Sequence, residues 1–256
     1  MAVTYPPGAA VKPQRRLPDP QLAGLLARFA LLVGVDFALL AVLVIAVFGT
    51  GGAALAFTLY FAVNAVLLFG LIRDYPHARL GLCNIVTHFR ATLTAGLAAI
   101  VASTVSQASD PALAWSVVAI ATIALACDGV DGWAARRSGL SSRFGARFDM
   151  EVDSMLALIL AVIVWQSGKV GEWVLLLGVM RYLFVVAMWV FPWINRPTPP
   201  RFSGKLVCVI QIAALIALIA PWVIGAGAVL IAAAALAAVI WSFGVDLRYL
   251  WKTRSA

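Results

Sequence analysis

Long apolar runs recur along the whole chain, and they restrict the possible folds more than any other feature. Each run approaches the length of about 20 residues that an α-helix needs to cross the hydrocarbon core of a bilayer. Hydrophobic residues make up 63% of the chain and charged residues only 12%, a composition far from that of soluble domains. The sequence lacks the short alternating strands of a membrane β-barrel. It therefore predicts an all-α polytopic membrane protein.

About eight transmembrane helices are expected. They are predicted over residues 29–48, 53–72, 91–107, 112–128, 153–167, 172–192, 206–220 and 223–244. A polar and basic stretch, residues 73–90, separates the first two spans from the other six. The predicted division is a cytoplasmic N-terminal tail (1–27), an additional transmembrane hairpin with its linker (28–80), a six-helix catalytic core (81–247) and a basic cytoplasmic C-terminal tail (248–256).

The distribution of the 19 lysines and arginines indicates the orientation of the chain. If eight helices alternate in direction, nearly all basic residues outside the spans fall on one side, with Lys169 as the exception. The positive-inside rule then places both termini in the cytoplasm, as in a multi-pass inner-membrane protein. Topology and contact with anionic lipids explain the net charge of +8, so no nucleic-acid partner is predicted.

Four aspartates lie together in one segment between two apolar runs. Asp128 and Asp131 are three residues apart and Asp149 and Asp153 four apart, so each pair lies on one face of a helix. A hairpin about the turn-like residues 138–141 would bring both pairs to the same height on neighbouring helices. Carboxylates at a membrane boundary are costly unless cations compensate them. We therefore expect the four side chains to converge on bound cations.

Hard divalent cations suit such a group of carboxylates. Oxygen donors without histidine or cysteine favour Mg²⁺ or Mn²⁺ over zinc, and four carboxylates can hold two ions. Paired metal ions are well suited to phosphoryl transfer, because they stabilise charge on the phosphate oxygens. Gly129, Gly132 and Gly145 would let a nucleotide phosphate approach the backbone. Close helix packing explains any one of these glycines equally well.

The spacing of this segment resembles the signature of the CDP-alcohol phosphotransferase (CDP-alcohol phosphatidyltransferase) family. The residues DGVDGWAARRSGLSSRFGARFDMEVD fit the pattern D-x2-D-G-x2-A-R-x8-G-x3-D-x3-D at every fixed position. The stretch NIVTHFR, residues 84–90, is similar to the N-x-x-T-x-x-R that opens the first core helix of many members. The resemblance extends over roughly residues 82–250.

This resemblance implies a metal-dependent enzyme of phospholipid biosynthesis, typically a homodimer. Such an enzyme transfers a phosphatidyl or other substituted phosphate group from a CDP-linked lipid to an alcohol hydroxyl and releases CMP. The resemblance implies that Asp128, Asp131 and Asp149 are metal ligands, and that Asp153 is the general base while also contacting metal. The residues that it implies for the CDP-donor site are Asn84, Thr87, Gly132, Ala135, Arg136 and Gly145.

The identities of the donor and the acceptor are predicted from less specific sequence features than the aspartate motif. The small core resembles the branch that uses CDP-diacylglycerol. Basic residues that would bind the phosphate of an acceptor such as glycerol 3-phosphate are Arg147, Arg181, Arg201 and Lys205. Topology and anionic lipid offer another explanation for Arg201 and Lys205. Inositol phosphate, inositol, serine and phosphatidylglycerol stay open as acceptors.

Some features depart from the family pattern or fall outside it. The N-terminal hairpin, and Asp36 within its first span, are additions to the minimal pattern. His77 and His88 are interpreted as ordinary polar residues near the cytoplasmic surface. The widely spaced Cys83 and Cys127, with Cys208, predict neither disulfides nor a zinc site.

Two other functional classes also place carboxylates in membrane helices. An intramembrane prenyltransferase uses aspartate pairs with Mg²⁺, but its motifs lie in two well-separated segments with an asparagine-led pattern that this chain lacks. A cation-binding transporter would show an inverted repeat or broken helices at mid-membrane. Here the carboxylates are predicted at one surface, which favours the transferase.

Overall fold

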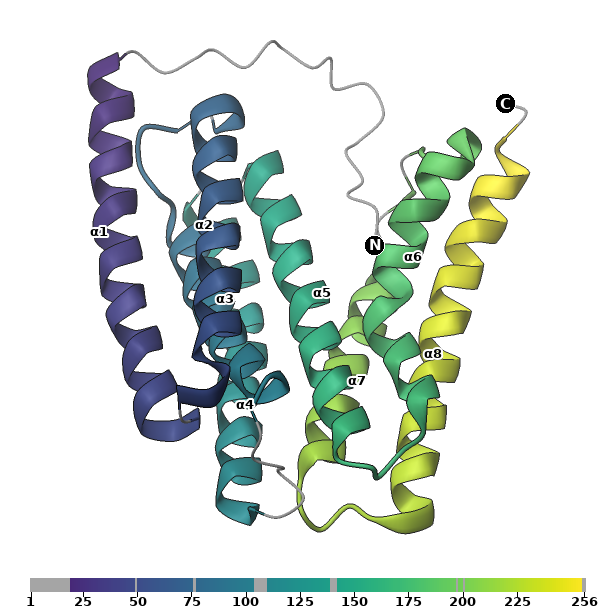
Figure 1. Cartoon of the computed structure of the whole chain (residues 1–256). Coiled ribbons are helices and arrows are strands. Elements are labelled where there is room, and N and C mark those ends of the chain that lie inside the picture. Colours follow the sequence, from purple (N-terminus) through teal and green to yellow (C-terminus); the bar gives the residue numbers. More distant parts are fainter. Residues whose placement is uncertain are drawn as a thin grey trace. The chain divides into compact units, whose positions relative to one another are not determined.

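The computed structural model describes most of the chain (Figure 1). It covers residues 19–48, 50–75, 77–103, 110–138, 142–196, 198–199 and 201–254; within these ranges, the side chains of residues 19, 130–138 and 143 are not described. All regular elements in these ranges are helical, which confirms the all-α prediction. The predicted N-terminal tail lies mainly outside the described residues.

Eight α-helices form the described chain. They are α1 (Asp19–Leu43), α2 (Ala53–Asp74), α3 (Leu82–Val101), α4 (Pro111–Ser138), α5 (Arg143–Gln166), α6 (Leu175–Val190), α7 (Phe202–Ile219) and α8 (Gly225–Lys252). Short helical turns join or extend them: a π-turn η1 (Val44–Phe48) and 3₁₀ turns η2 (Thr50–Gly52), η3 (Glu172–Val174) and η4 (Pro192–Ile194). Each predicted span corresponds to one of the eight helices.

Among the described residues, six of these helices are long and apolar enough to cross a membrane: α1, α2, α4, α6, α7 and α8. The other two, α3 and α5, begin about ten residues before the predicted spans, at Leu82 and Arg143. Their first turns contain the polar residues of the candidate site, and hydropathy alone assigns such residues to loops. Helix α1 likewise begins earlier than predicted, at Asp19.

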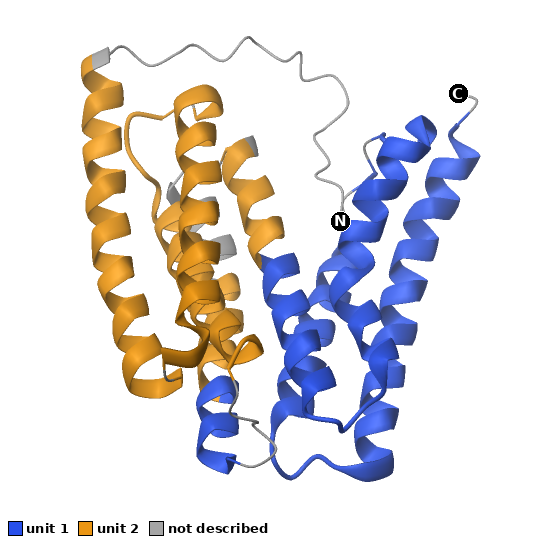
Figure 2. Cartoon of the chain, in the orientation of Figure 1, with its two compact units in different colours: residues 1–9, 107–118, 153–256 blue, residues 10–106, 119–152 orange. Residues whose placement is uncertain are grey.

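The chain divides into two compact units (Figure 2). We call residues 10–106 and 119–152 the hairpin unit, and residues 1–9, 107–118 and 153–256 the C-terminal unit. In the hairpin unit, α1 and α2 both pack against α3. A buried apolar cluster fills the interior between these elements. Its buried members are Leu25, Phe29, Leu67, Leu71 and Tyr75.

In the C-terminal unit, α8 packs against both α6 and α7. The loop after α5 contributes the ammonium group of Lys169, which donates to the carbonyls of Leu218, Ile219 and Ala220 at 3.0, 3.2 and 2.7 Å. These carbonyls end α7 and have no partner within the helix. A cation also interacts favourably with the negative end of a helix dipole. Lys169 therefore caps α7.

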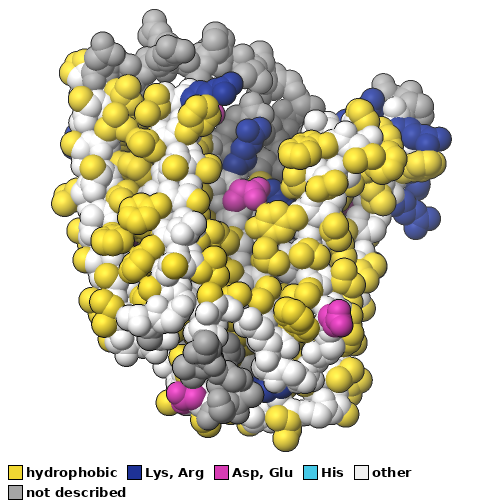
Figure 3. All heavy atoms as spheres, viewed as in Figure 1, with side chains coloured by type: hydrophobic (Ala, Val, Ile, Leu, Met, Phe, Trp, Pro, Cys, Tyr) yellow, Lys and Arg dark blue, Asp and Glu magenta, His cyan; other side chains and the backbone are white. Residues whose placement is uncertain are grey.

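The helices present large apolar side chains outward. Leu31 is 71% exposed, Val66 70%, Trp189 81% and Phe202 82%, and Figure 3 shows apolar side chains spread over the helices with few charges among them. Apolar exposure on this scale is unfavourable in water. Hydrocarbon is the solvent that suits it, in agreement with a multi-pass membrane protein.

Candidate active site

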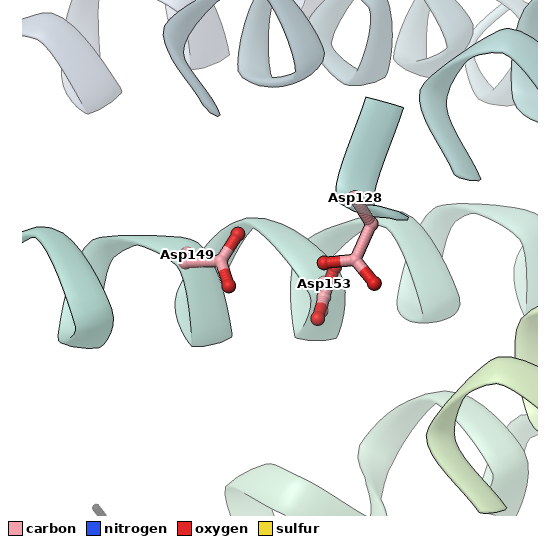
Figure 4. A group of neighbouring side chains, drawn as sticks. All are labelled: Asp128, Asp149 and Asp153. Carbon is pink, nitrogen blue, oxygen red and sulfur yellow. The ribbon is translucent and has the colours of Figure 1, made fainter. Parts of the chain in front are cut away.

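Three of the four aspartates lie close together. One carboxylate oxygen each from Asp128, Asp149 and Asp153 lies within 4.8 Å of the other two. We call these three residues the acidic cluster. Figure 4 shows Asp149 and Asp153 on successive turns of α5, and the carboxylate of Asp128, from α4, beside that of Asp153. All three side chains are partly exposed, so a ligand can reach them.

Local sequence fixes where the two helices begin. The carboxylate of Asp110 accepts the backbone N–H groups of Ala112 and Leu113 at 2.9 and 3.2 Å, which caps the start of α4. The hydroxyl of Ser142 accepts the backbone N–H of Gly145 at 3.0 Å and caps α5 in the same way. Helix α4 ends at Ser138 and α5 begins at Arg143, and residues 139–141 of the predicted turn lie outside the described residues.

Arg90 supplies a positive charge to the acidic cluster. Its side chain is fully buried, and Nη1 donates to Oδ1 of Asp149 at 2.6 Å and to Oδ1 of Asp128 at 3.3 Å. Nε donates to the carbonyl of Ala124 at 3.0 Å, which fixes the guanidinium plane. Arg90 thus joins α3 to both helices of the acidic cluster. Sequence reasoning placed Arg90 in the N-x-x-T-x-x-R motif but did not predict it as a site residue.

The acidic cluster fits a hard divalent cation. Its donors are carboxylate oxygens, which Mg²⁺ and Mn²⁺ prefer. Among the described side chains, the guanidinium of Arg90 contacts two of these three carboxylates, those of Asp128 and Asp149. The side chains of Asp128 and Asp149 are 28% and 33% exposed while Arg90 is at 0%. Asp128 and Asp149 are therefore partly open to solvent, whereas the Arg90 guanidinium that contacts them is buried.

Asp153 has a second neighbour in the C-terminal unit. The Sγ atom of Cys208, on α7, lies 4.0 Å from Oδ2 of Asp153, at the limit of a weak S–H···O hydrogen bond. Asp153 is partly exposed and lies one turn beyond Asp149 on α5. Asp153 is therefore a member of the acidic cluster that also contacts Cys208.

Two of the residues implied for the donor site, Asn84 and Gly145, lie against each other. A Cβ atom added at Gly145 would lie 2.6 Å from Oδ1 of Asn84, so a glycine is required there for the present position of that oxygen. Asn84 is 8% exposed, and its Nδ2 donates to the hydroxyl of Tyr75 at 3.0 Å. Thr87, one turn further on α3, is buried and donates to the carbonyl of Cys83 at 2.9 Å.

The other implied donor residues belong to the last turns of α4. Gly132, Ala135 and Arg136 lie within this helix, as does the fourth aspartate, Asp131, but their side chains lie outside the described part of the structure. Their implied roles stay predictions.

The basic residues predicted for the acceptor phosphate have different surroundings. Nη2 of Arg201 lies 2.5 Å from Oδ1 of Asp246 and donates to the carbonyl of Ser242 at 3.1 Å. Arg201 is therefore held against α8 by an ion pair, and a phosphate would have to share its guanidinium. Arg181, on α6, is half-buried, while Arg147 and Lys205 are exposed.

His88 differs from the sequence interpretation. It is 2% exposed, far from an ordinary surface position, and its Nδ1 lies 2.5 Å from Oδ2 of Asp36. Its Nε2 lies 2.9 Å from Oδ1 of Asn64. Thr92 adds a longer contact to Asp36, at 3.4 Å. We call these four residues the polar bridge, because they link α1 and α2 to α3.

The chain matches a family of known proteins. No curated protein and no solved structure shows significant similarity to the chain. A family model described as CDP-alcohol phosphatidyltransferase matches residues 80–241, well over half of the chain. The matched region begins just before α3 and includes Arg90 and the acidic cluster, and it leaves α1 and α2 outside. The chain therefore belongs to the CDP-alcohol phosphatidyltransferase family.

Proposed function

We propose that the chain transfers a phosphatidyl group from CDP-diacylglycerol to an alcohol hydroxyl and releases CMP. Membership of the family supports the general reaction, transfer of a substituted phosphate from a CDP-alcohol. The observation that carries the proposal is the convergence of the Asp128, Asp149 and Asp153 carboxylates, within 4.8 Å of one another, beside a buried arginine. The apolar outer faces of the helices suit a donor whose acyl chains stay in the bilayer.

Asp128, Asp131 and Asp149 would hold Mg²⁺ or Mn²⁺, with Asp153 as a further contact. Two bound ions would compensate the charge of the diphosphate and stabilise the leaving CMP. Arg90 holds Asp128 and Asp149 in place from their buried side. Asn84, Thr87, Gly132, Ala135, Arg136 and Gly145 would line the CDP portion of the donor.

Asp153 would act as the general base. The acceptor hydroxyl oxygen attacks the phosphorus that carries the diacylglycerol, and a new P–O bond forms. The bond from that phosphorus to the bridging oxygen breaks, and the bridging oxygen leaves with CMP. The hydroxyl proton passes to the Asp153 carboxylate. Its partly exposed position at the acidic cluster supports this role.

The acceptor is proposed to carry a phosphate, as glycerol 3-phosphate does. Arg147, Arg181, Arg201 and Lys205 are the candidate partners of that phosphate. The guanidinium of Arg201 is held by Asp246 and the Ser242 carbonyl and would have to be shared with that phosphate. Inositol phosphate, inositol, serine and phosphatidylglycerol are the alternative acceptors.

The proposed setting is the inner membrane, with both termini and the acidic cluster on the cytoplasmic side and two chains forming a homodimer. The charge distribution supports the orientation, because the basic residues outside the spans gather on one side. Cytidine nucleotides are cytoplasmic, which fits a site on that side.

Lipid mass spectrometry tests the substrates directly. The purified full chain is incubated with CDP-diacylglycerol, Mg²⁺ or Mn²⁺, and each candidate acceptor in turn. We expect one phosphorylated acceptor to give a new phospholipid. If no acceptor releases CMP and no CDP-linked donor binds, the proposal is wrong. Cation flux through vesicles containing the inactive chain would then favour a cation transporter.

A further inference from the structure

The hairpin formed by α1 and α2 lies outside the matched family region. It nevertheless makes its polar contacts with α3, the helix that carries Asn84, Thr87 and Arg90. One contact comes from the polar bridge, through Asp36 and Asn64 to His88. The other comes from Tyr75, the residue immediately after α2, and reaches Asn84. Both contacts reach one face of α3, since positions 84 and 88 are one turn apart.

The hydroxyl of Tyr75 uses all of its hydrogen-bonding capacity. It donates its proton to the carbonyl of Arg79 at 2.9 Å, since a carbonyl oxygen only accepts hydrogen bonds. Its two lone pairs accept the backbone N–H of Gly81 at 3.3 Å and Nδ2 of Asn84 at 3.0 Å. Burial raises the pKa of Tyr75 above its ordinary value, so the hydroxyl keeps its proton.

This arrangement determines how the Asn84 amide is turned. Because the Tyr75 hydroxyl has already donated its proton, only the NH₂ group of Asn84 can satisfy it. The amide oxygen Oδ1 then points to the opposite side, over Gly145. An oxygen in that position accepts a hydrogen bond from an N–H or O–H group, such as those of a cytosine base or a ribose.

The space beside Asn84 and His88 is too small for a substrate. These two residues line an otherwise mostly apolar cavity of about 20 Å³, with room for one water. Its other walls come from α1, α2, the start of α5 and Leu80. The face of α3 toward the hairpin is therefore a packing face. Tyr75, 4% exposed, acts on a ligand only through Asn84.

We propose that Tyr75 is a positioning residue that orients Asn84 for the CDP-linked donor, so that the N-terminal hairpin is a working part of the donor site. This inference rests on the proposed function. It explains why a hairpin outside the family region is joined to the first core helix by polar bonds, where apolar packing alone would hold two helices together. The polar bridge fixes α3 one turn further along, and Tyr75 fixes the direction of the Asn84 amide.

Tyr75→Phe is the informative change, because it removes the hydroxyl and keeps a ring in the apolar cluster with Leu71 and Phe29. We expect KM for CDP-diacylglycerol to rise about five- to tenfold, the effect of one lost hydrogen bond, with little change in kcat. Tyr60→Phe is the matched control, since the buried Tyr60 hydroxyl donates to the carbonyl of Val33 within the hairpin, at 2.6 Å. It should leave KM at the wild-type value.

The double variant Tyr75→Phe/Asn84→Ala shows whether Tyr75 works through Asn84. We expect its KM to equal that of Asn84→Ala alone. An unchanged KM in Tyr75→Phe would overturn the inference. So would a rise in KM in the double variant that equals the product of the rises in the two single variants. A wild-type chain that releases no CMP would instead refute the proposed function, and the donor role of Tyr75 with it. Thermal unfolding of the wild type, the two single variants and the double variant tests the Tyr75–Asn84 hydrogen bond separately. We expect the shifts in melting temperature to be non-additive by about 2–4 °C. Additive shifts would show that the bond is absent.

Discussion

At the scale of single residues, Arg90 and the carboxylates around it determine what the site can bind. Arg90 is fully buried, and its guanidinium contacts two of the three aspartates of the acidic cluster. A buried charge is tolerated only with such partners. The same guanidinium occupies the inner side of the acidic cluster and leaves the outer side for a cation. We therefore expect Arg90 to act as a structural counter-charge that competes in part with a divalent cation at the acidic cluster.

Replacing Arg90 should weaken the fold and strengthen metal binding. Arg90→Gln removes the guanidinium that contacts Asp128 and Asp149, so we expect the unfolding free energy to fall by about 3–5 kcal/mol without metal. Mn²⁺ should raise the melting temperature of this variant more than that of the wild type. Arg90→Lys, which keeps the charge, should behave more like the wild type. Equal Mn²⁺ shifts in all three proteins would contradict the assignment.

Asp153 and Asp128 should differ in how their loss affects the reaction. Asp153→Asn removes the proposed base, so we expect transfer to fall by about 10²–10⁴-fold while a CDP-linked donor still binds in the presence of Mn²⁺. Asp128→Asn should lose both transfer and donor binding, because it weakens the metal site. Isothermal titration with the donor, alongside a CMP-release assay, separates the two. Equal loss of binding in both variants would argue against a base role for Asp153.

At the scale of helices, the polar bridge shows how the hairpin is attached. Nδ2 of Asn64 donates to the carbonyl of Tyr60 at 2.9 Å, so its Oδ1 faces His88 and accepts the proton on Nε2. The remaining ring nitrogen, Nδ1, faces the Asp36 carboxylate and lies 2.5 Å from its Oδ2. All groups of this bridge are buried. Loss of Asp36 or of Asn64 therefore removes one of the two ring contacts of His88.

A double-mutant cycle tests the polar bridge. Asp36→Leu alone takes away the partner of Nδ1 on the buried His88 ring, and we expect it to lower the unfolding free energy by about 3–5 kcal/mol. The double variant Asp36→Leu/His88→Leu replaces both partners with apolar groups and should recover much of that loss. Thermal unfolding in detergent measures both. A double variant whose loss equals or exceeds the sum of the losses in Asp36→Leu and His88→Leu would contradict a direct partnership.

Helix number was predictable from the sequence, but some helix starts and polar partners were not. The apolar runs of the sequence predict eight helices, and each of them corresponds to an α-helix among the described residues. Helices α3 and α5 begin earlier than hydropathy indicates, because Asn84, Arg90 and Asp149 are polar yet helical. Nothing local in the sequence pairs His88 with Asp36, which lies 52 positions away. Such partners are fixed only by tertiary packing.

At the scale of the whole molecule, motif and fold lead to the same reaction. The aspartate spacing on two successive helices predicts convergence, and the structure brings the three described members of the set together. Family membership then specifies a CDP-alcohol donor. The acceptor could not be derived in this way. The partners of the basic residues proposed to bind it, such as Asp246 beside Arg201, lie far away in the sequence. Sequence spacing does not indicate such partners.

CMP release under metal control tests the central proposal most directly. The purified full chain is stripped of metal with EDTA, supplied with CDP-diacylglycerol and the acceptor panel, and titrated with Mn²⁺ or Mg²⁺. CMP and new phospholipid should appear in equal amounts only after the cation is added, and Asp149→Asn should abolish both. CMP release that persists without a divalent cation, or that survives the loss of Asp149, would contradict a metal-dependent transfer at the acidic cluster.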